Sequence, residues 1–237
     1  MILSRRLDTI VNMIKPCNVL ADIGCDHGYV SISAIKRGLA QSVISADVAK
    51  GPLDAAKRNA AAEGTLDQTD FILSDGLLGF PDASGIECVV IAGMGGILVR
   101  KILEQGKLQR FCKLHQLVLG PQSDLDLVRK YLIEELKASI ENEKCVYDDG
   151  KYYFLMDVAL QTENAPYEEF EYHFGKHIDP ETIDTYIEYL EHRNRQLHIA
   201  RESAEKGNAE RNASKIAVIN ESIKYIETAL IKAGGSK

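Results

Sequence analysis

The sequence lacks the features that would place the chain in a membrane or outside the cell. No apolar run approaches the roughly 18 residues that a membrane-spanning helix needs. Residues 1–15 lack the uninterrupted apolar core and the small-residue cleavage site of a signal peptide. Their apolar residues fall instead on one face of a helix. We therefore expect a soluble, cytoplasmic protein.

Paired cysteines are missing as well. The five cysteines lie far apart, form no C-x-x-C pair and are odd in number. Such a set argues against a disulfide framework and against a structural zinc site. We expect no metal.

The chain also lacks the excess of positive charge that is typical of nucleic-acid binders, since its formal net charge is −7. The acidic residues are concentrated in the second half, however, and adjacent basic residues recur in the first. These pairs would form a phosphate-binding surface if the fold gathered them on one side. The pairs are Arg5-Arg6, Lys36-Arg37, Lys57-Arg58 and Arg100-Lys101. The sequence permits an anionic partner without requiring one.

Short runs rich in valine and isoleucine alternate with helical patterns over the first two thirds of the chain. Strands are predicted at 19–24, 42–48, 71–76, 87–93 and 115–121, and helices at 29–37, 52–62, 97–105 and 124–136, the last with Asp124 as its N-cap. This alternation is typical of βαβ units, in which helices cover both faces of a parallel sheet. Residues 137–161 break the rhythm, because two strand-like stretches flank Asp148-Asp149-Gly150 and so predict a hairpin.

The last third has a different pattern. Asp179 and Pro180 mark a helix start, and apolar residues at alternating spacings of three and four follow over 183–197 and again over 216–230. Gly207 lies in the polar connection between them. Two such helices should pair as an antiparallel hairpin, acting in packing, as a substrate clamp or as a dimerisation arm. The predicted fold is α/β, a doubly wound Rossmann-like domain over 1–162 with a helical coiled-coil domain over 163–237.

A glycine-containing turn follows the first predicted strand, in the segment Ala21–Tyr29. Asp26 and Tyr29 stand where a dinucleotide-binding fingerprint aligned on Gly24 would have glycines. A pyrophosphate at this turn would meet the negative charges of Asp22 and Asp26. S-adenosylmethionine has no phosphate and carries an ammonium and a sulfonium, so the acidic turn favours it over NAD.

Three further motifs follow the next three strands, at the edge where open α/β sheets bind ligands. Asp47 ends the second strand and is placed to accept hydrogen bonds from ribose hydroxyls, a feature that NAD enzymes share. Asp75, with Gly76, is placed to meet an adenine amino group. Three glycines within 93–96 carry an entropic cost, which a flat floor under a planar substrate would explain.

Together these motifs resemble the bacterial tRNA (adenine-22-N1)-methyltransferase family. The resemblance rests on Leu3–Leu7, Ala21–Tyr29, Asp47-Val48 with Gly51–Leu53, Ser74–Leu77 and Ala92–Gly96. It implies transfer of a methyl group from S-adenosylmethionine to N1 of an adenine in the D-arm of tRNA. By the same likeness, the cofactor pocket consists of Asp22, Gly24, Asp26, His27, Asp47, Val48, Ser74, Asp75, Gly76 and Gly93.

Adenine N1 has its own in-plane lone pair, so the predicted reaction depends chiefly on positioning and on exclusion of water. The target base must also leave its stack to enter the pocket. Met94 is a candidate to pack on the base, and His27 and Tyr29 are candidates for substrate contact or proton handling, with Asp22 a weaker one. Each has a plainer alternative, since His27 could cap the turn, Tyr29 could cover the cofactor and Met94 could belong to the core. Arg5, Arg6, Arg100 and Lys101 are the candidate tRNA contacts.

Three other functions stay open at this point. The chain could be a methyltransferase acting on a protein or a small metabolite, which its acidic net charge slightly favours. It could be an NAD-dependent oxidoreductase, against which Asp26 and Tyr29 argue. It could also be a non-catalytic RNA-binding protein that keeps a cofactor pocket. We expect a monomer, although sequence alone leaves the oligomeric state open.

Overall fold

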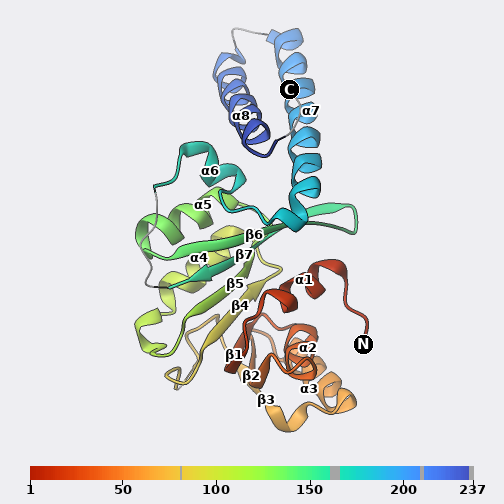
Figure 1. The fold of residues 1–237 in the computed structure, drawn as a ribbon, viewed down its shortest axis with the longest axis vertical. Coiled ribbons are helices and arrows are strands. Elements are labelled where there is room, and N and C mark those ends of the chain that lie inside the picture. The colour runs from red at the N-terminus through yellow and green to blue at the C-terminus, as the bar shows by residue number, and fades with distance from the viewer. Residues whose placement is uncertain (81, 161–165, 209–210, 235–237) are drawn as a thin grey trace.

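The structure is a computed structural model that describes residues 1–80, 82–160, 166–208 and 211–234. In these ranges, seven strands form one sheet in the order β3-β2-β1-β4-β5-β7-β6, and two long helices stand at one end of it (Figure 1). The strands are β1 Cys17–Ile23, β2 Ala40–Asp47, β3 Thr69–Leu73, β4 Cys88–Ala92, β5 Gln116–Gly120, β6 Ser139–Asp148 and β7 Lys151–Ala159. The helices are α1 Arg5–Met13, α2 Tyr29–Lys36, α3 Lys50–Glu63, α4 Gly96–Gln105, α5 Leu125–Lys130, α6 Glu169–Phe174, α7 Ile183–Asn208 and α8 Ala213–Lys232.

The order of the strands positions the site. Strands β1 to β5 are mutually parallel, and β7 inserts antiparallel between β5 and β6. The chain winds outward from β1 to β3 and then crosses back to β4, on the other side of β1. The strand order therefore reverses between β1 and β4, and the carboxyl ends of these two strands border the crevice where such sheets bind ligands.

Both faces of the sheet are buried, which explains the uninterrupted apolar runs in its strands. Neighbouring residues of a strand point to opposite faces, so Val90 packs with Ile10 of α1, whereas Val89 packs with Val99 of α4 and Val128 of α5. Helices α1 and α2 thus cover one face and α4 and α5 the other. The predicted doubly wound α/β domain is confirmed.

The predicted hairpin is confirmed too. Asp149 and Gly150 connect β6 to β7 with φ of 47° and 76°, the two left-handed residues of a tight hairpin turn. One face of the hairpin packs against α1 through Val146. The other carries Phe154, which packs with Tyr186 of α7. The hairpin therefore lies between the rest of the sheet and the C-terminal helices (Figure 1).

Helices α7 and α8 pack side by side and run in opposite directions, as the apolar spacing predicted (Figure 1). Leu190 of α7 and Ile226 of α8 are fully buried between them and the hairpin. Asp179 accepts a hydrogen bond from the backbone N–H of Glu181 and so begins the short turn Pro180–Thr182 that leads into α7. None of the helices in the described ranges is both long enough and apolar enough to cross a membrane.

Local details differ from the predictions. Asp124 occupies the predicted N-cap position of α5, but its side chain makes no capping hydrogen bond, because its backbone is left-handed and its carboxylate accepts from the Ser123 hydroxyl at 2.6 Å. The helix predicted over 124–136 ends as a π-helical turn, Tyr131–Glu135. Strand β3 ends at Leu73 rather than at residue 76, so the following residues form a turn. Gly207 lies inside α7 rather than in the connection. The domain boundary predicted between residues 162 and 163 lies outside the described residues.

Candidate active site

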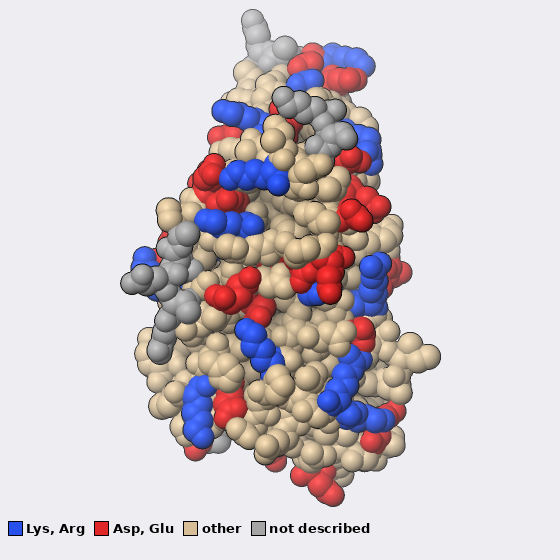
Figure 2. Space-filling model, in the orientation of Figure 1, with Lys and Arg blue, Asp and Glu red and all other residues tan. Residues whose placement is uncertain are grey.

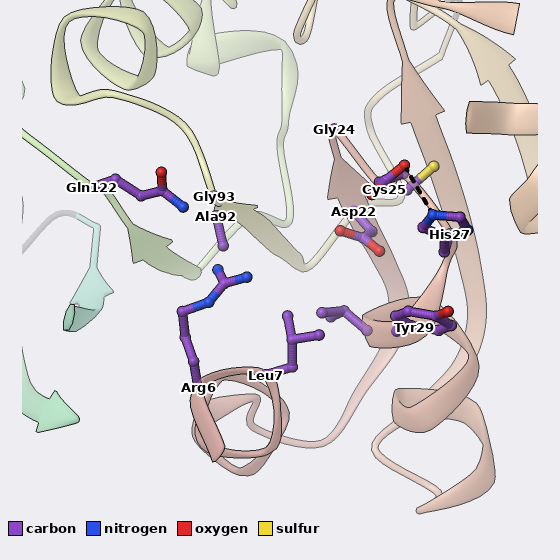
Figure 3. Close-up of a pocket in the computed structure, with 12 residues that line it drawn as sticks. Arg6, Leu7, Asp22, Gly24, Cys25, His27, Tyr29, Ala92, Gly93 and Gln122 are labelled. Atoms are coloured by element: carbon purple, nitrogen blue, oxygen red, sulfur yellow. Dashed lines mark ion pairs between the residues drawn. The ribbon is translucent and has the colours of Figure 1, made fainter. Parts of the chain in front are cut away.

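A cavity of about 220 Å³ opens between the carboxyl ends of β1 and β4 (Figure 3). Its position is the switch point that the strand order defines. Three parts of the chain converge on it, namely the glycine turn after β1, the ends of β4 and β5, and α1. The lining residues are Arg6, Leu7, Asp22, Gly24, Cys25, Asp26, His27, Tyr29, Val30, Ala92, Gly93 and Gln122.

Asp22 lies at the end of β1 and is 4% exposed. One carboxylate oxygen accepts hydrogen bonds from the Ser31 hydroxyl at 2.6 Å and from the Ser31 backbone N–H at 3.2 Å. Its other oxygen has no such partner among the described residues. Burial raises the pKa of Asp22 to about 6, against the lowering effect of the two Ser31 hydrogen bonds. A buried carboxylate held in this way would be stabilised by a cationic ligand.

The turn after Asp22 is narrow because its backbone is left-handed at three positions, Gly24, Asp26 and Gly28. A Cβ atom on Gly24 would lie 2.2 Å from the Cε methyl of Met94, and one on Gly28 would lie 3.0 Å from the Cβ of Ala56. The turn therefore depends on glycine for its conformation and for close approach. Met94 itself is half-buried, packs against the main core and covers Gly24 with its thioether end.

His27 and Tyr29 stand at the mouth of the cavity with their rings stacked, 5.4 Å apart between centroids and inclined by 15°. His27 Nε2 lies 3.7 Å from a carboxylate oxygen of Asp26. The His27 backbone carbonyl accepts from the Asn59 side chain at 2.9 Å. His27 is half-exposed, and its ring makes no hydrogen bond that caps the turn within the part of the chain that the structure describes.

Asp47 ends β2. One of its carboxylate oxygens accepts a hydrogen bond from the Ala49 backbone N–H at 2.9 Å, and the other accepts one from the Asp26 backbone N–H at 3.4 Å. It thereby links the β2 turn to the glycine turn. Val48 is 69% exposed beside it. Neither residue lines the cavity itself. They lie at the adjacent strand end, where an elongated ligand extending from the cavity along the sheet edge would reach them.

In the turn after β3, the Ser74 side chain makes hydrogen bonds within the turn itself. The Ser74 hydroxyl donates to the Gly76 carbonyl at 2.7 Å and accepts from the Gly79 N–H at 2.9 Å. Gly76 has φ of 58°, and a Cβ there would lie 2.9 Å from Ile102. Asp75 is exposed, and its carboxylate makes no hydrogen bond with the other described residues.

The glycines after β4 have separate explanations. Gly93 lines the cavity with φ of 81°. A Cβ on Gly96, by contrast, would lie 2.3 Å from the Ser123 carbonyl oxygen, and one on Gly95 would lie 3.1 Å from the Ser123 hydroxyl. The prediction that three glycines form a floor for the substrate is therefore wrong for Gly95 and Gly96. These two allow the loop after β5 to pack closely against α4.

Arg6 reaches the cavity although sequence analysis had assigned it only to tRNA. It lies in the first turn of α1, where its backbone N–H donates to the Asp148 carboxylate at 3.0 Å. Its guanidinium lies 5.2 Å from the Tyr153 ring centroid and points toward Ala92 and Gly93 (Figure 3). Arg5 is exposed and does not line the cavity.

The other two predicted tRNA contacts lie elsewhere, on α4. Arg100 is paired with Glu104 at 2.5 Å and with Glu135 at 3.2 Å, and it stacks over Tyr131. Lys101 is exposed. The fold therefore does not gather the basic pairs into one surface at the cavity. On the face in Figure 2, blue and red side chains alternate without a broad patch of either sign.

Sequence analysis missed Gln122. The residue follows β5 and extends its amide into the cavity, opposite Arg6 (Figure 3). The available signal was its position, since a polar residue directly after a central parallel strand lies at the ligand-binding edge. Within the described residues, no group of three or more His, Cys, Asp or Glu is arranged to hold a metal ion.

The lining suits S-adenosylmethionine. Its acidic groups cluster at the glycine turn, where Asp22 is buried with one unpartnered oxygen and Asp26 is exposed. A cationic amino acid moiety would compensate this charge, whereas a pyrophosphate would be repelled. Asp47 lies at the end of the neighbouring strand, β2.

Comparisons with known proteins agree with this geometry. A family model described as a methyltransferase domain matches residues 3–156. The chain is 31% identical over 178 residues to the tRNA (adenine(22)-N(1))-methyltransferase of Bacillus subtilis, a match that spans 75% of this chain and 74% of the relative.

Two solved structures resemble nearly the whole chain. Streptococcus pneumoniae Sp1610 in complex with S-adenosyl-L-methionine superimposes with a TM-score of 0.84 at 26% identity, over 97% of this chain and 100% of that one. A protein from Listeria monocytogenes serotype 4b gives a TM-score of 0.88 at 26% identity over the same shares. From the family model, the extent of the match to the B. subtilis enzyme and the switch-point cavity, we conclude that the chain belongs to the tRNA (adenine(22)-N(1))-methyltransferase family.

Proposed function

We propose that this protein transfers a methyl group from S-adenosylmethionine to N1 of adenine 22 in the D-arm of tRNA. The observation that carries the proposal is the cavity between β1 and β4, which has the buried Asp22 carboxylate at its base. The segment that matches the methyltransferase family model, residues 3–156, includes all the residues that line this cavity. The enzyme would act in the cytoplasm, where its substrate is found.

S-adenosylmethionine supplies an electrophilic methyl group on a positively charged sulfur. The residues of this chain hold it in place. Asp22 and Asp26 offer negative charge to its cationic end, and the Gly24 turn allows close backbone approach. Asp47 and Asp75 offer carboxylates to the ribose hydroxyls and the adenine amino group at the next two strand ends. Val48 would cover one face of the adenine.

The target adenine needs no prior loss of a proton, because N1 attacks with a lone pair that lies in the plane of the ring. The protein therefore accelerates the reaction by aligning N1 with the methyl group and by excluding water. Gly93 borders the space where the base would enter, and His27 and Tyr29 flank its mouth. Met94 does not line the cavity itself and would meet the base only beside Gly24, which its thioether covers. Extraction of the base from its stack costs a few kcal/mol, which contacts elsewhere on the tRNA must offset.

Arg6 is the best-placed cation to contribute such a contact, since its guanidinium is held over Tyr153 at the rim of the cavity. We expect Arg6→Ala to raise the KM for tRNA about 10-fold or more, with little change in S-adenosylmethionine affinity. Arg5→Ala, on the adjacent exposed residue, should have a smaller effect. Steady-state kinetics on both variants would test this difference, and unchanged kinetics in the double variant would remove both residues from tRNA binding.

The decisive experiment measures transfer of labelled methyl from S-adenosylmethionine to unmodified bulk tRNA, followed by nucleoside analysis. Formation of 1-methyladenosine, lost when adenine 22 is replaced by guanine in a transcript, is the expected result. Label in another nucleoside would contradict the proposed position of transfer. No label in tRNA, with cofactor binding demonstrated separately, would favour a protein or metabolite substrate instead. The expected monomeric state stays a prediction, which light scattering on the purified protein can test.

A further inference from the structure

The Gln122 side chain is a polar part of the cavity lining with no role in the proposed binding of the cofactor or of tRNA. It projects from the loop after β5 toward Gly93 and the Arg6 guanidinium (Figure 3). Within the described residues, its backbone N–H is hydrogen-bonded, whereas its side-chain amide is not. An amide carries both a donor and an acceptor, so an unengaged one in a ligand cavity is equipped to recognise a group with the complementary pair.

The backbone that carries Gln122 is fixed against the end of β4. The hydrogen bonding between β4 and β5 continues past the end of β4, where Gly93 N–H donates to the Gly120 carbonyl at 3.1 Å. It then extends past both strands, where Gln122 N–H donates to the Met94 carbonyl at 2.8 Å. A third bond joins Gly96 N–H to the Ser123 carbonyl at 3.0 Å. The backbone of Gln122 is therefore held at a set distance from the Gly93 turn, so only its exposed side chain has to be ordered when a ligand binds.

We infer that Gln122 determines base specificity by binding the Hoogsteen edge of the target adenine, an inference that rests on the proposed function. Its Oε1 would accept from the N6 amino group and its Nε2 would donate to N7, the bidentate pairing that glutamine makes with adenine. This pairing leaves N1 and its lone pair free to face the methyl group. It also aligns the plane of the base, on which attack at the methyl carbon depends.

The charged side chains that line the cavity cannot provide the same recognition. Asp26 offers only acceptors when ionised, and Arg6 offers only donors, so neither completes the N6 and N7 pair by itself. Guanine presents acceptors at both O6 and N7, so the Gln122 oxygen would face the O6 oxygen without a hydrogen bond. Guanine N1 also carries a proton. The amide therefore discriminates against the purine that could enter the same cavity but could not react.

The test combines a protein variant with a modified substrate. Transcripts with adenine or 7-deazaadenine at position 22 are methylated by the wild-type enzyme, by Gln122→Ala and by Gln105→Ala, and kcat/KM is measured for each pair. Gln105 is an exposed glutamine at the end of α4, outside the cavity, and serves as the matched control. Any change that 7-deazaadenine causes in the reactivity of N1 is common to all three enzymes and cancels when their ratios are compared.

We expect 7-deazaadenine to lower kcat/KM about 10-fold or more for the wild type and for Gln105→Ala, and to have a much smaller effect on Gln122→Ala, which can no longer donate to N7. An equal penalty in all three enzymes would overturn the inference. So would weakened S-adenosylmethionine binding in Gln122→Ala with the penalty unchanged, because the residue would then belong to the cofactor site. Failure of the wild type to methylate the adenine transcript would contradict the proposed function instead.

Discussion

At the scale of a single residue, the burial of Asp22 lowers the stability of the folded chain. Its carboxylate is buried at the base of the cavity, and its pKa of about 6 lies well above the 3.8 of a free aspartate. The ionised form is thus less favourable in the folded chain than in the unfolded one. Above pH 6 the ionised Asp22 carboxylate therefore lowers the free energy of unfolding. This loss of stability disappears as the pH falls from 6 toward 4, because the carboxylate becomes protonated in the folded chain.

The Asp22→Asn variant should be more stable than the wild type by about 2 kcal/mol at pH 8, and by much less at pH 4.5. It should also bind S-adenosylmethionine at least about 10-fold more weakly at pH 8, because the charge that meets the cation is gone. Wild-type affinity should fall as the pH drops through 6, whereas that of the variant should stay flat. Urea unfolding and calorimetric titration measure the two effects. Asp75→Asn, an exposed carboxylate, is the stability control.

His27 is the residue at the mouth of the cavity that could act as a general base. Because adenine N1 already has a lone pair, we expect His27→Ala to lower kcat by less than about 10-fold. The loss should come from disturbed stacking with Tyr29, 5.4 Å away between ring centroids. Single-turnover kinetics would separate a change in the rate of methyl transfer from a change in tRNA binding. A loss of about 100-fold or more, with normal binding, would instead make His27 a general base.

At the scale of elements, the junction between α4 and the loop after β5 determines the shape of one cavity wall. Gly96 begins α4 where the Ser123 and Asp124 carbonyl oxygens approach, and a Cβ would lie 2.3 and 2.7 Å from them. Both contacts are with backbone, which cannot rotate away. This loop carries Gln122, so helix packing and the position of the amide are coupled.

The Gly96→Ala variant should lose about 2 kcal/mol of stability, because the added methyl overpacks this junction. It should also lose activity as the loop after β5 shifts. The matched control is Gly51→Ala in the first turn of α3, where no atom lies within 4 Å of the added Cβ; that change should be neutral or stabilise by up to about 1 kcal/mol. Thermal unfolding compares the two, and equal behaviour would refute the packing explanation.

At the scale of the whole molecule, a fully buried ion pair in the sheet domain holds the segment that leads into the C-terminal helices. Arg129 of α5 and Glu143 of β6 are both fully buried, with Nε 2.8 Å and Nη2 2.7 Å from the same carboxylate oxygen. Arg129 Nη1 also donates to the carbonyls of Tyr172 and His173 at the end of α6. The other Glu143 oxygen accepts from the Lys176 backbone N–H at 3.2 Å. The pair thus anchors the segment that leads into α7.

Removal of one partner should be costly, because it leaves the other charge buried alone. We expect Arg129→Met to lower the free energy of unfolding by about 3–5 kcal/mol, and the double variant Arg129→Met/Glu143→Leu to recover most of that loss. Arg100→Met, which breaks the more exposed pair with Glu104, should cost at most about 1 kcal/mol. Urea unfolding measures all three. A double variant as unstable as Arg129→Met would show that the ion pair itself contributes the stability.

The sequence by itself determined the features that depend on local chemistry. Apolar periodicity identified the parallel sheet and the helical hairpin, and Asp149-Gly150 identified the turn between β6 and β7, because these signals lie within a few neighbouring residues. The motifs after the strands also identified the sheet edge that holds the cavity. Strand limits were less accurate, since β3 ends three residues earlier than its pattern indicated.

Only the tertiary structure decided which distant residues meet. Arg6 and Gln122 enter one cavity because α1 packs against the sheet and β5 follows β4 in the strand order. Arg100 is paired with carboxylates rather than placed beside Arg6. Gly96 has to be glycine because the loop after β5 packs against it. Arg129 donates to a carbonyl of α6, a helix outside the sheet. Such contacts depend on packing between elements far apart in the chain, which periodicity and turn chemistry do not encode.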